Sequence, residues 1–248
     1  MLDTRREITG KVSIVGHRGA PDCAPENTMA SFKEALRQGA DMIELDVQLS
    51  ADGHVMVFHD GRLDRTSTGS GPFAERTLAE LRTLDAGGWF GPRFDGERIP
   101  TLEEVLAWAR DAIPLLIELK YDEAPGPALG YAAVQLVQAC KMMEQVMFIS
   151  FAHQALQWVK QEAPDVATAP LYSAPVPDPV GLAREIGANA IMPLCHAVTE
   201  GDVIQCHDAG LSVQVWGAGV DYARYVAMGV DCVNADNPAQ IRQHLFGE

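Results

Sequence analysis

The feature of this chain that most constrains its fold is a regular alternation of short apolar segments with longer amphipathic segments. Eight of the apolar segments are each followed by a stretch with helical periodicity, and their shortness favours strands over helices. Short strands that are apolar on both faces are typical of parallel sheets covered by helices. The alternation therefore predicts a closed, eight-stranded parallel α/β barrel, a TIM barrel. The predicted strands span residues 12–17, 42–47, 114–119, 146–151, 166–172, 190–194, 211–217 and 231–236.

An open, doubly wound sheet is the alternative arrangement, but no predicted strand is followed by the G-x-G-x-x-G pattern of a dinucleotide site. Residues 60–100 interrupt the alternation, because they are rich in Gly, Thr and Arg and have little helical periodicity. A strand-like run at 54–59 precedes them, and the Ala51–Gly53 turn folds it back as a hairpin. We expect one domain over residues 1–248, with a small insertion over residues 60–100 after the second strand.

The composition narrows the classes of partner. The net charge is −15 at pH 7, which argues against nucleic acid and anionic membrane surfaces, since both attract basic patches. No apolar run approaches the roughly 18 residues of a transmembrane helix, and the first residues lack the apolar core of a signal peptide. The five cysteines show no CxxC spacing, which favours reduced thiols in a cytoplasmic protein.

Two acidic residues, Glu44 and Asp46, stand within the second predicted strand. Because alternate side chains of a strand point to the same face, the two carboxylates lie side by side, and Ile43, Leu45 and Val47 face the opposite layer. Two neighbouring acids are unfavourable unless something positive lies between them. Mg²⁺ and Ca²⁺ prefer oxygen ligands and are the natural partners. Ordinary charges on a solvent-facing strand edge are the alternative.

Further polar residues follow the ends of other predicted strands. In an α/β barrel the carboxyl ends of the strands form the active site, so these side chains are expected to converge. Together they predict a metal-assisted acid–base site for an anionic substrate. The residues are His17 and Arg18 after the first strand, His59 after the hairpin strand, Glu118 and Lys120 after the third strand, and Trp216 after the seventh.

At these residues the chain resembles the glycerophosphodiester phosphodiesterase family, and the resemblance covers nearly its whole length. Two positions depart from the family pattern. Trp216 is followed by Gly217-Ala218-Gly219, where the family often has an Asn, and Ala235-Asp236 replaces a common Thr-Asp. The matching motifs are His17-Arg18-Gly19 with Pro25-Glu26-Asn27-Thr28, Glu44-x-Asp46, Phe58-His59-Asp60 through Leu63-Asp64-Arg65-Thr66, Ile99-Pro100-Thr101-Leu102-Glu103-Glu104, and Glu118-Leu119-Lys120.

The resemblance implies a reaction and a cofactor. The reaction is hydrolysis of glycerophosphodiesters, such as glycerophosphocholine or glycerophosphoethanolamine, to sn-glycerol 3-phosphate and an alcohol. Glu44, Asp46 and Glu118 would bind a divalent cation, Mg²⁺ or Ca²⁺, that neutralises charge on the phosphate. Arg18 and Lys120 would hold the non-bridging phosphate oxygens.

The resemblance also implies how protons move. His17 and His59 would share the general base and general acid roles, and the order between them stays open. The nucleophile would be the glycerol hydroxyl next to the phosphate, which gives a cyclic phosphate that water then opens. Trp216 would contribute to substrate binding. Whether the chain forms a homo-oligomer also stays open.

Two other classes of function are alternatives. Lys120 could act as a Schiff-base residue in an aldolase or isomerase, although its place beside carboxylates favours a charge role. The chain could also be a barrel that binds its ligand without turnover, although the presence of both histidines and all three carboxylates argues against this.

Overall fold

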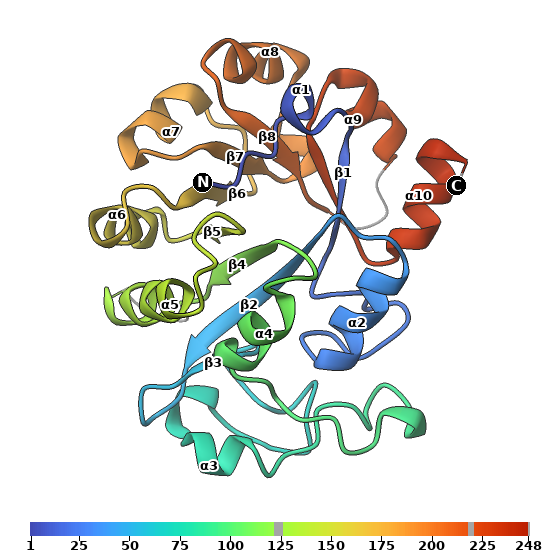
Figure 1. Ribbon diagram of the computed structural model, residues 1–248, viewed down its shortest axis with the longest axis vertical. Coiled ribbons are helices and arrows are strands. Elements are labelled where there is room, and N and C mark those ends of the chain that lie inside the picture. The colour runs from blue at the N-terminus through green and yellow to red at the C-terminus, as the bar shows by residue number, and fades with distance from the viewer. Residues whose placement is uncertain (122–125, 218–220, 248) are drawn as a thin grey trace.

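The computed structural model describes residues 1–121, 126–217 and 221–247, and its strands lie inside a ring of helices (Figure 1). Within these residues eight parallel strands pair in the order β1-β2-β4-β5-β6-β7-β8-β9, and β9 pairs with β1. The sheet is closed, which confirms the predicted barrel over the open sheet. The strands are β1 (Ser13–Gly16), β2 (Met42–Leu49), β4 (Leu115–Leu119), β5 (Val146–Ser150), β6 (Ala167–Tyr172), β7 (Ala190–Pro193), β8 (Ser212–Val215) and β9 (Cys232–Ala235).

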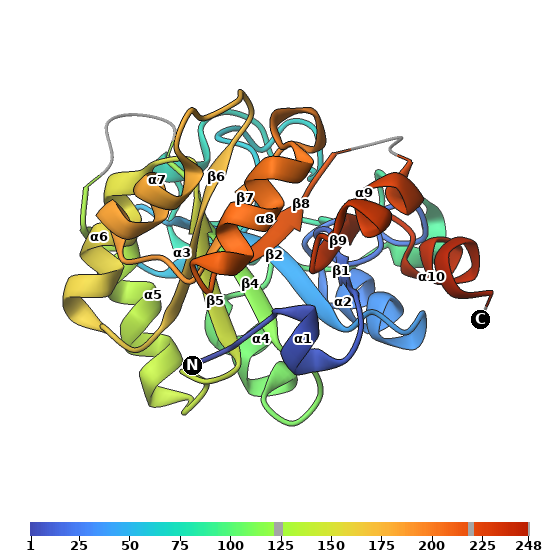
Figure 2. The same ribbon diagram turned by 90° about the horizontal axis from the view of Figure 1, so that it is seen from above.

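A helix lies between each barrel strand and the next, and the last helix follows β9 (Figure 2). Thr101 caps the start of α4 with a capping box, in which its hydroxyl and the Glu104 carboxylate each bind the other residue's backbone N–H. None of the described helices is long and apolar enough to cross a membrane. The helices are α2 (Met29–Arg37), α4 (Leu102–Ala109), α5 (Ala128–Ala139), α6 (His153–Glu162), α7 (Pro179–Ile186), α8 (Glu200–Asp208), α9 (Tyr222–Met228) and α10 (Pro238–Phe246).

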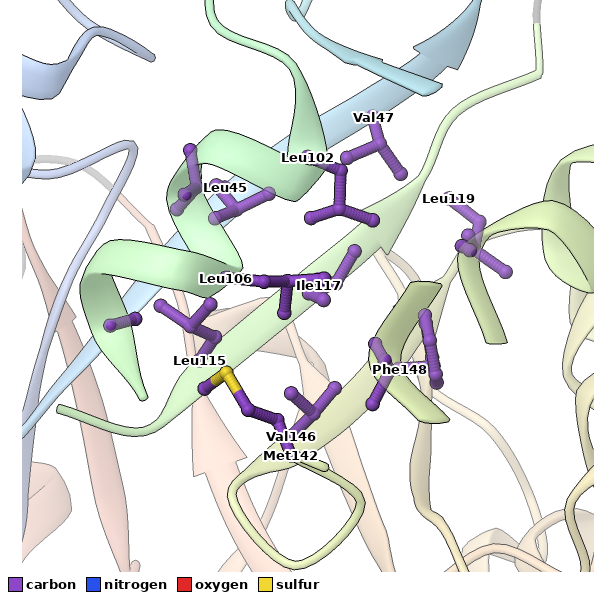
Figure 3. Close-up of a cluster of buried hydrophobic side chains, with 14 of the residues drawn as sticks. Leu45, Val47, Leu102, Leu106, Leu115, Ile117, Leu119, Met142, Val146 and Phe148 are labelled. Atoms are coloured by element: carbon purple, nitrogen blue, oxygen red, sulfur yellow. The ribbon is translucent and has the colours of Figure 1, made fainter. Parts of the chain in front are cut away.

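Alternate side chains of β2 and β4 point to opposite sides of the barrel wall, as the sequence predicts. Leu45 and Val47 of β2 face outward and pack with Ile117 of β4 against Leu102 and Leu106 of α4 (Figure 3). Burial of these apolar side chains between strands and helices supplies the main stabilising term of the fold. It also fixes the strand register, and so places Glu44 and Asp46 inside the barrel.

The interior of the barrel changes character along its axis. Its apolar part is formed by buried side chains, among them Val15, Met42, Leu116 and Met147, which pack together as a core. The end where the strands begin is closed by the N-terminal segment, which contains α1 (Arg6–Thr9). The Thr4 hydroxyl lies 2.7 Å from that of Ser212, at the start of β8. The buried carboxylates of the interior lie toward the opposite end, where the strands finish.

The stretch between β2 and α4 forms a small body beside the barrel (Figure 1). The stretch begins with β3 (Val55–Val57), which pairs antiparallel with β2 and confirms the predicted hairpin. The rest holds the short helices η1 (Phe73–Glu75), α3 (Leu78–Leu81) and η2 (Pro92–Phe94). The stretch has a core of its own, in which the rings of Phe58 and Phe73 stack with centroids 5.0 Å apart. This packing holds the end of β3, and with it His59, against the barrel.

The apolar core between the barrel strands and the helices gives a test of stability. Phe148 of β5 is fully buried in the cluster of Figure 3. Phe148→Ala is expected to reduce the free energy of unfolding by about 3–5 kcal/mol, because it removes apolar contacts and leaves a cavity. Urea denaturation measures the change. Phe246→Ala, at a side chain that is 39% exposed, is the control and should change stability by less than about 1 kcal/mol. Equal effects of the two substitutions would contradict the assignment of Phe148 to the core.

Candidate active site

Three carboxylates meet inside the barrel, near the end of β4 and about halfway along β2. Glu44 and Asp46 come from β2 and Glu118 from β4, and the parallel register pairs Asp46 with Glu118. All three residues are buried, and each offers an oxygen that lies within 4.8 Å of the others. The sequence predicted that Glu44 and Asp46 share one face, and the closed barrel brings Glu118 beside them.

The three carboxylates disfavour one another's ionisation. Burial, reinforced by the charge of Asp46, raises the pKa of Glu44 to about 7 and that of Glu118 to about 8. Burial also opposes ionisation of Asp46, but Lys120 and Arg18 lower its pKa below the ordinary range. Asp46 Oδ1 is buried and has no hydrogen-bond partner. A buried carboxylate oxygen that accepts no hydrogen bond, beside two acids that resist ionisation, fits a hard divalent cation.

Two cationic side chains border this cluster. The Arg18 backbone N–H donates to Glu44 Oε2 at 2.8 Å, and its guanidinium Nε lies 3.4 Å from Asp46 Oδ2. The Lys120 ammonium lies 2.7 Å from Glu118 Oε1 and 3.2 Å from Asp46 Oδ1. Both cations thus lie close to the carboxylates, and Lys120 forms ion pairs there, in line with the charge role that its place in the sequence favours.

Each of the two predicted histidines is held by a carboxylate. His17 Nδ1 lies 2.7 Å from Asp236 Oδ1, and His59 Nδ1 lies 2.6 Å from Asp60 Oδ1. With Nδ1 occupied, Nε2 of each ring is available for proton transfer. Burial opposes protonation of His17, but Asp236 and Glu44 outweigh it and raise its pKa. For His59 burial prevails and lowers the pKa.

A chain of ion pairs connects His59 with Arg18. Arg65 binds both oxygens of Asp60, with its Nε 2.6 Å from Oδ2, and both oxygens of Glu26, at 2.7 and 2.8 Å. Glu26 in turn accepts from an Arg18 Nη at 2.9 Å. The interruption between β3 and α4 therefore supplies a residue, Arg65, that orders the barrel rim.

Backbone conformation also shapes the site. Arg18 and Asn27 adopt positive φ angles of 50° and 57°, which side-chain-bearing residues rarely take. The Asn27 amide donates to Asp46 Oδ2 at 2.7 Å and its oxygen accepts from the Asp46 N–H at 3.2 Å. This pair of bonds fixes Asp46, so the local strain serves the geometry of the carboxylate cluster.

Several site residues were not assigned from the sequence. Glu26, Asn27, Asp60 and Arg65 stand inside the motifs quoted above, but a motif does not say which side chains pair. Asp236 ends the last predicted strand, and a carboxylate at that position is the sequence signal for a partner of His17.

Three adjoining cavities open above the carboxylates. The central cavity, of about 230 Å³, includes Glu44, Glu118 and both histidines in its lining. A wide cavity of about 540 Å³ extends from it past His59 and Phe151. A small cavity of about 220 Å³ extends past His17 and Trp216.

The structure places Trp216 at the wall of the central and small cavities. Its indole N–H donates to the Met192 carbonyl at 3.1 Å, and its ring meets Phe151 edge to face with centroids 5.5 Å apart. The departure from the family pattern at Ala218 and Gly219 lies outside the described residues. Trp216 thus adjoins the cavity with its indole nitrogen already paired, and its part in substrate binding stays a prediction.

An α/β barrel with this arrangement of acids, cations and histidines at its C-terminal rim defines a barrel enzyme. Comparison with known proteins gives the particular family. The chain belongs to the glycerophosphoryl diester phosphodiesterase family, whose model matches residues 17–240. It is therefore a glycerophosphodiester phosphodiesterase by family.

Similar proteins support this membership over most of the chain. A glycerophosphodiester phosphodiesterase of Caldanaerobacter subterraneus is 37% identical over 92% of this chain and 95% of the relative. The structure of one from Agrobacterium tumefaciens is 36% identical, with a TM-score of 0.81, and covers 92% of this chain and 97% of that one. A phosphodiesterase of Oleispira antarctica, solved with the product sn-glycerol-3-phosphate, is 29% identical with a TM-score of 0.90; the match covers 97% of this chain and 99% of that one.

Proposed function

We propose that this protein hydrolyses glycerophosphodiesters, such as glycerophosphocholine and glycerophosphoethanolamine, to sn-glycerol 3-phosphate and an alcohol, with Mg²⁺ or Ca²⁺ as cofactor. The observation that carries the proposal is the buried cluster of Glu44, Asp46 and Glu118 in a cavity that both histidines also line. A phosphodiester is an anion that gains negative charge as it reacts, so such a site suits it. The product bound by the Oleispira antarctica neighbour supports the substrate class.

The carboxylates would hold the cation, and the cation when bound would neutralise charge on a phosphoryl oxygen. Lys120 pairs with Glu118 and Asp46, and with a cation held by these carboxylates its ammonium would be free to bind a phosphate oxygen. Arg18 is held by Glu26 and lines the central cavity together with Lys120. The proposed role of both cations is to hold the phosphate in place while protons move.

The two histidines would act as acid and base in a two-step reaction. In the first step, one imidazole accepts the proton of the glycerol hydroxyl next to the phosphate as that oxygen bonds to phosphorus. The other imidazole gives a proton to the leaving alcohol as its P–O bond breaks. In the second step, water opens the cyclic phosphate and the two proton transfers run in reverse. Asp236 and Asp60 keep Nε2 of each ring available.

Carbon chemistry through a Schiff base on Lys120 is not favoured. A Schiff-base lysine must lose its proton near neutral pH, which requires a lowered pKa. Burial works in that direction, but Asp46 and Glu118 outweigh it and raise the pKa of Lys120. Lys120 is therefore suited to act as a charge.

Substrate breadth tests the proposal. The wide cavity leaves room for different alcohols, so we expect the choline, ethanolamine and glycerol diesters to be turned over at rates within about tenfold of one another. Phosphorus NMR follows each reaction and should show sn-glycerol 3-phosphate as the common product. Release of phosphocholine in place of choline would contradict the proposed reaction. Strict dependence on one alcohol would contradict the expected breadth.

Arg65 gives a test of how the rim is ordered. Arg65→Met frees Asp60 and Glu26, and kcat on glycerophosphocholine is expected to fall about 10–100-fold, as for other residues that position catalytic groups. The pH dependence should shift as well, because Asp60 helps His59 to hold a proton. Arg82→Met is the matched control, since Arg82 forms the same kind of two-bond pair with Glu104 away from the histidines. Equal losses in both variants would show that Arg65 acts only through stability.

A further inference from the structure

One polar side chain in the cavity wall takes no part in the contacts described above. Asn234 lies on β9 two residues after Cys232, whose side chain belongs to the barrel interior, so the Asn234 side chain also points inward. The residue is 5% exposed, and its amide oxygen is buried without a hydrogen-bond partner. Among the residues that the structure describes, its amide nitrogen makes no hydrogen bond, and unlike the oxygen it is not fully buried. A buried amide oxygen without a hydrogen-bond partner costs stability, so its presence calls for a reason.

The place of Asn234 suggests that reason. It lines both the central and the small cavity, and it shares this double position with His17, Arg18 and Trp216. A comparison with Gln214 is instructive, because its amide oxygen is buried and unpaired too. Gln214, however, binds Thr4 toward the closed end of the barrel and lines none of the three cavities. An unpaired amide therefore faces the substrate space at Asn234 and not at Gln214.

We propose that the Asn234 amide binds a hydroxyl group of the glycerol half of the substrate, an inference that rests on the proposed function. A primary amide offers both donors and an acceptor, which matches a hydroxyl that also donates and accepts. The amide is neutral, and the charged phosphate already has Arg18 and Lys120 nearby. The small cavity suits the constant three-carbon glycerol, and the wide cavity suits the alcohol that varies between substrates. Asn234 is thereby a specificity-determining residue.

Measurements of ligand binding test the proposed contact between Asn234 and a glycerol hydroxyl without any turnover. Calorimetry with saturating Mg²⁺ or Ca²⁺ compares sn-glycerol 3-phosphate with propyl phosphate, which has the same three carbons and phosphate but no hydroxyl groups. Wild-type protein is expected to prefer sn-glycerol 3-phosphate by roughly tenfold or more, the value of a hydrogen bond to a buried polar group. In Asn234→Leu this preference should fall toward equality, while affinity for propyl phosphate is kept. Gln214→Leu, the matched control, should keep the preference.

Thermal unfolding separates this role from a structural one. Because the Asn234 side chain makes no hydrogen bond in the described structure, Asn234→Leu should unfold at the same or a higher temperature. An unchanged preference in Asn234→Leu, or an equal loss in both variants, would overturn the inference. If Asn234→Leu does not fold, Asn234→Ala is measured in its place. Wild-type protein that shows the Asn234-dependent preference but fails to hydrolyse glycerophosphocholine would refute the proposed function and leave the contact standing.

Discussion

Replacing either His17 or His59 by alanine is expected to reduce kcat on glycerophosphocholine by about 10²–10⁴-fold. Each ring is fixed by a carboxylate at Nδ1 and borders the cavity that holds the carboxylate cluster. Each variant loses one of the two proton transfers, while affinity for the divalent cation should change little. His54→Ala is the control, because that side chain is 53% exposed and lies outside the cavities, and it should keep wild-type kcat.

The two roles can be separated with a diester whose leaving group is a nitrophenol. This leaving group needs little protonation, so the variant that lacks the acid should recover activity and the variant that lacks the base should not. In the wild type, the rate should follow a bell-shaped pH profile, because one ring must be neutral and the other protonated. If both alanine variants keep near-native kcat on glycerophosphocholine, the acid–base assignment is wrong.

Glu118→Gln is expected to weaken Mg²⁺ or Ca²⁺ binding by at least about 100-fold, since loss of a residue that only positions a ligand already costs about 10–100-fold. The substitution keeps the shape of the side chain and removes its charge. It should therefore raise the unfolding temperature of the metal-free protein, because burial and Asp46 already penalise the Glu118 charge. Calorimetry measures the affinity and thermal unfolding measures the stability.

The control for this change is Glu103→Gln, at an exposed side chain on α4. It should alter neither cation affinity nor the unfolding temperature of the metal-free protein. Glu118→Gln protein that binds the cation as tightly as wild type would remove Glu118 from the ligand set and leave Glu44 and Asp46 to be tested in the same way.

Much of the fold could be predicted because it depends on local pattern. The alternation of strands and helices, and the inward position of Glu44 and Asp46, follow from periodicity and burial. Boundaries were less certain: residues 127–144 have helical periodicity, but α5 ends at Ala139, and Lys141 takes a positive φ of 58° that breaks the helix. The four-residue helix α1 could not be predicted, because it is too short to show helical periodicity.

The pairings inside the site could not be predicted, because they join distant parts of the chain. His17 and Asp236 are 219 positions apart, and Arg65 and Glu26 are 39 apart. Closure of the barrel brings His17 beside Asp236. Packing of the segment after β3 brings Arg65 beside Glu26. The sequence also cannot show that the Asn234 amide lacks a partner, since that depends on every neighbour at once.

Hydrolysis of glycerophosphocholine with and without exhaustive chelation tests the central claim most directly. Purified protein that has been saturated with Mg²⁺ or Ca²⁺ should release sn-glycerol 3-phosphate and choline. Treatment with EDTA should abolish the release, and adding back the cation should restore it, because the buried cluster of Glu44, Asp46 and Glu118 fits a hard divalent ion. Full activity after chelation, or no release of sn-glycerol 3-phosphate under any cation, would contradict the proposed metal-dependent phosphodiesterase.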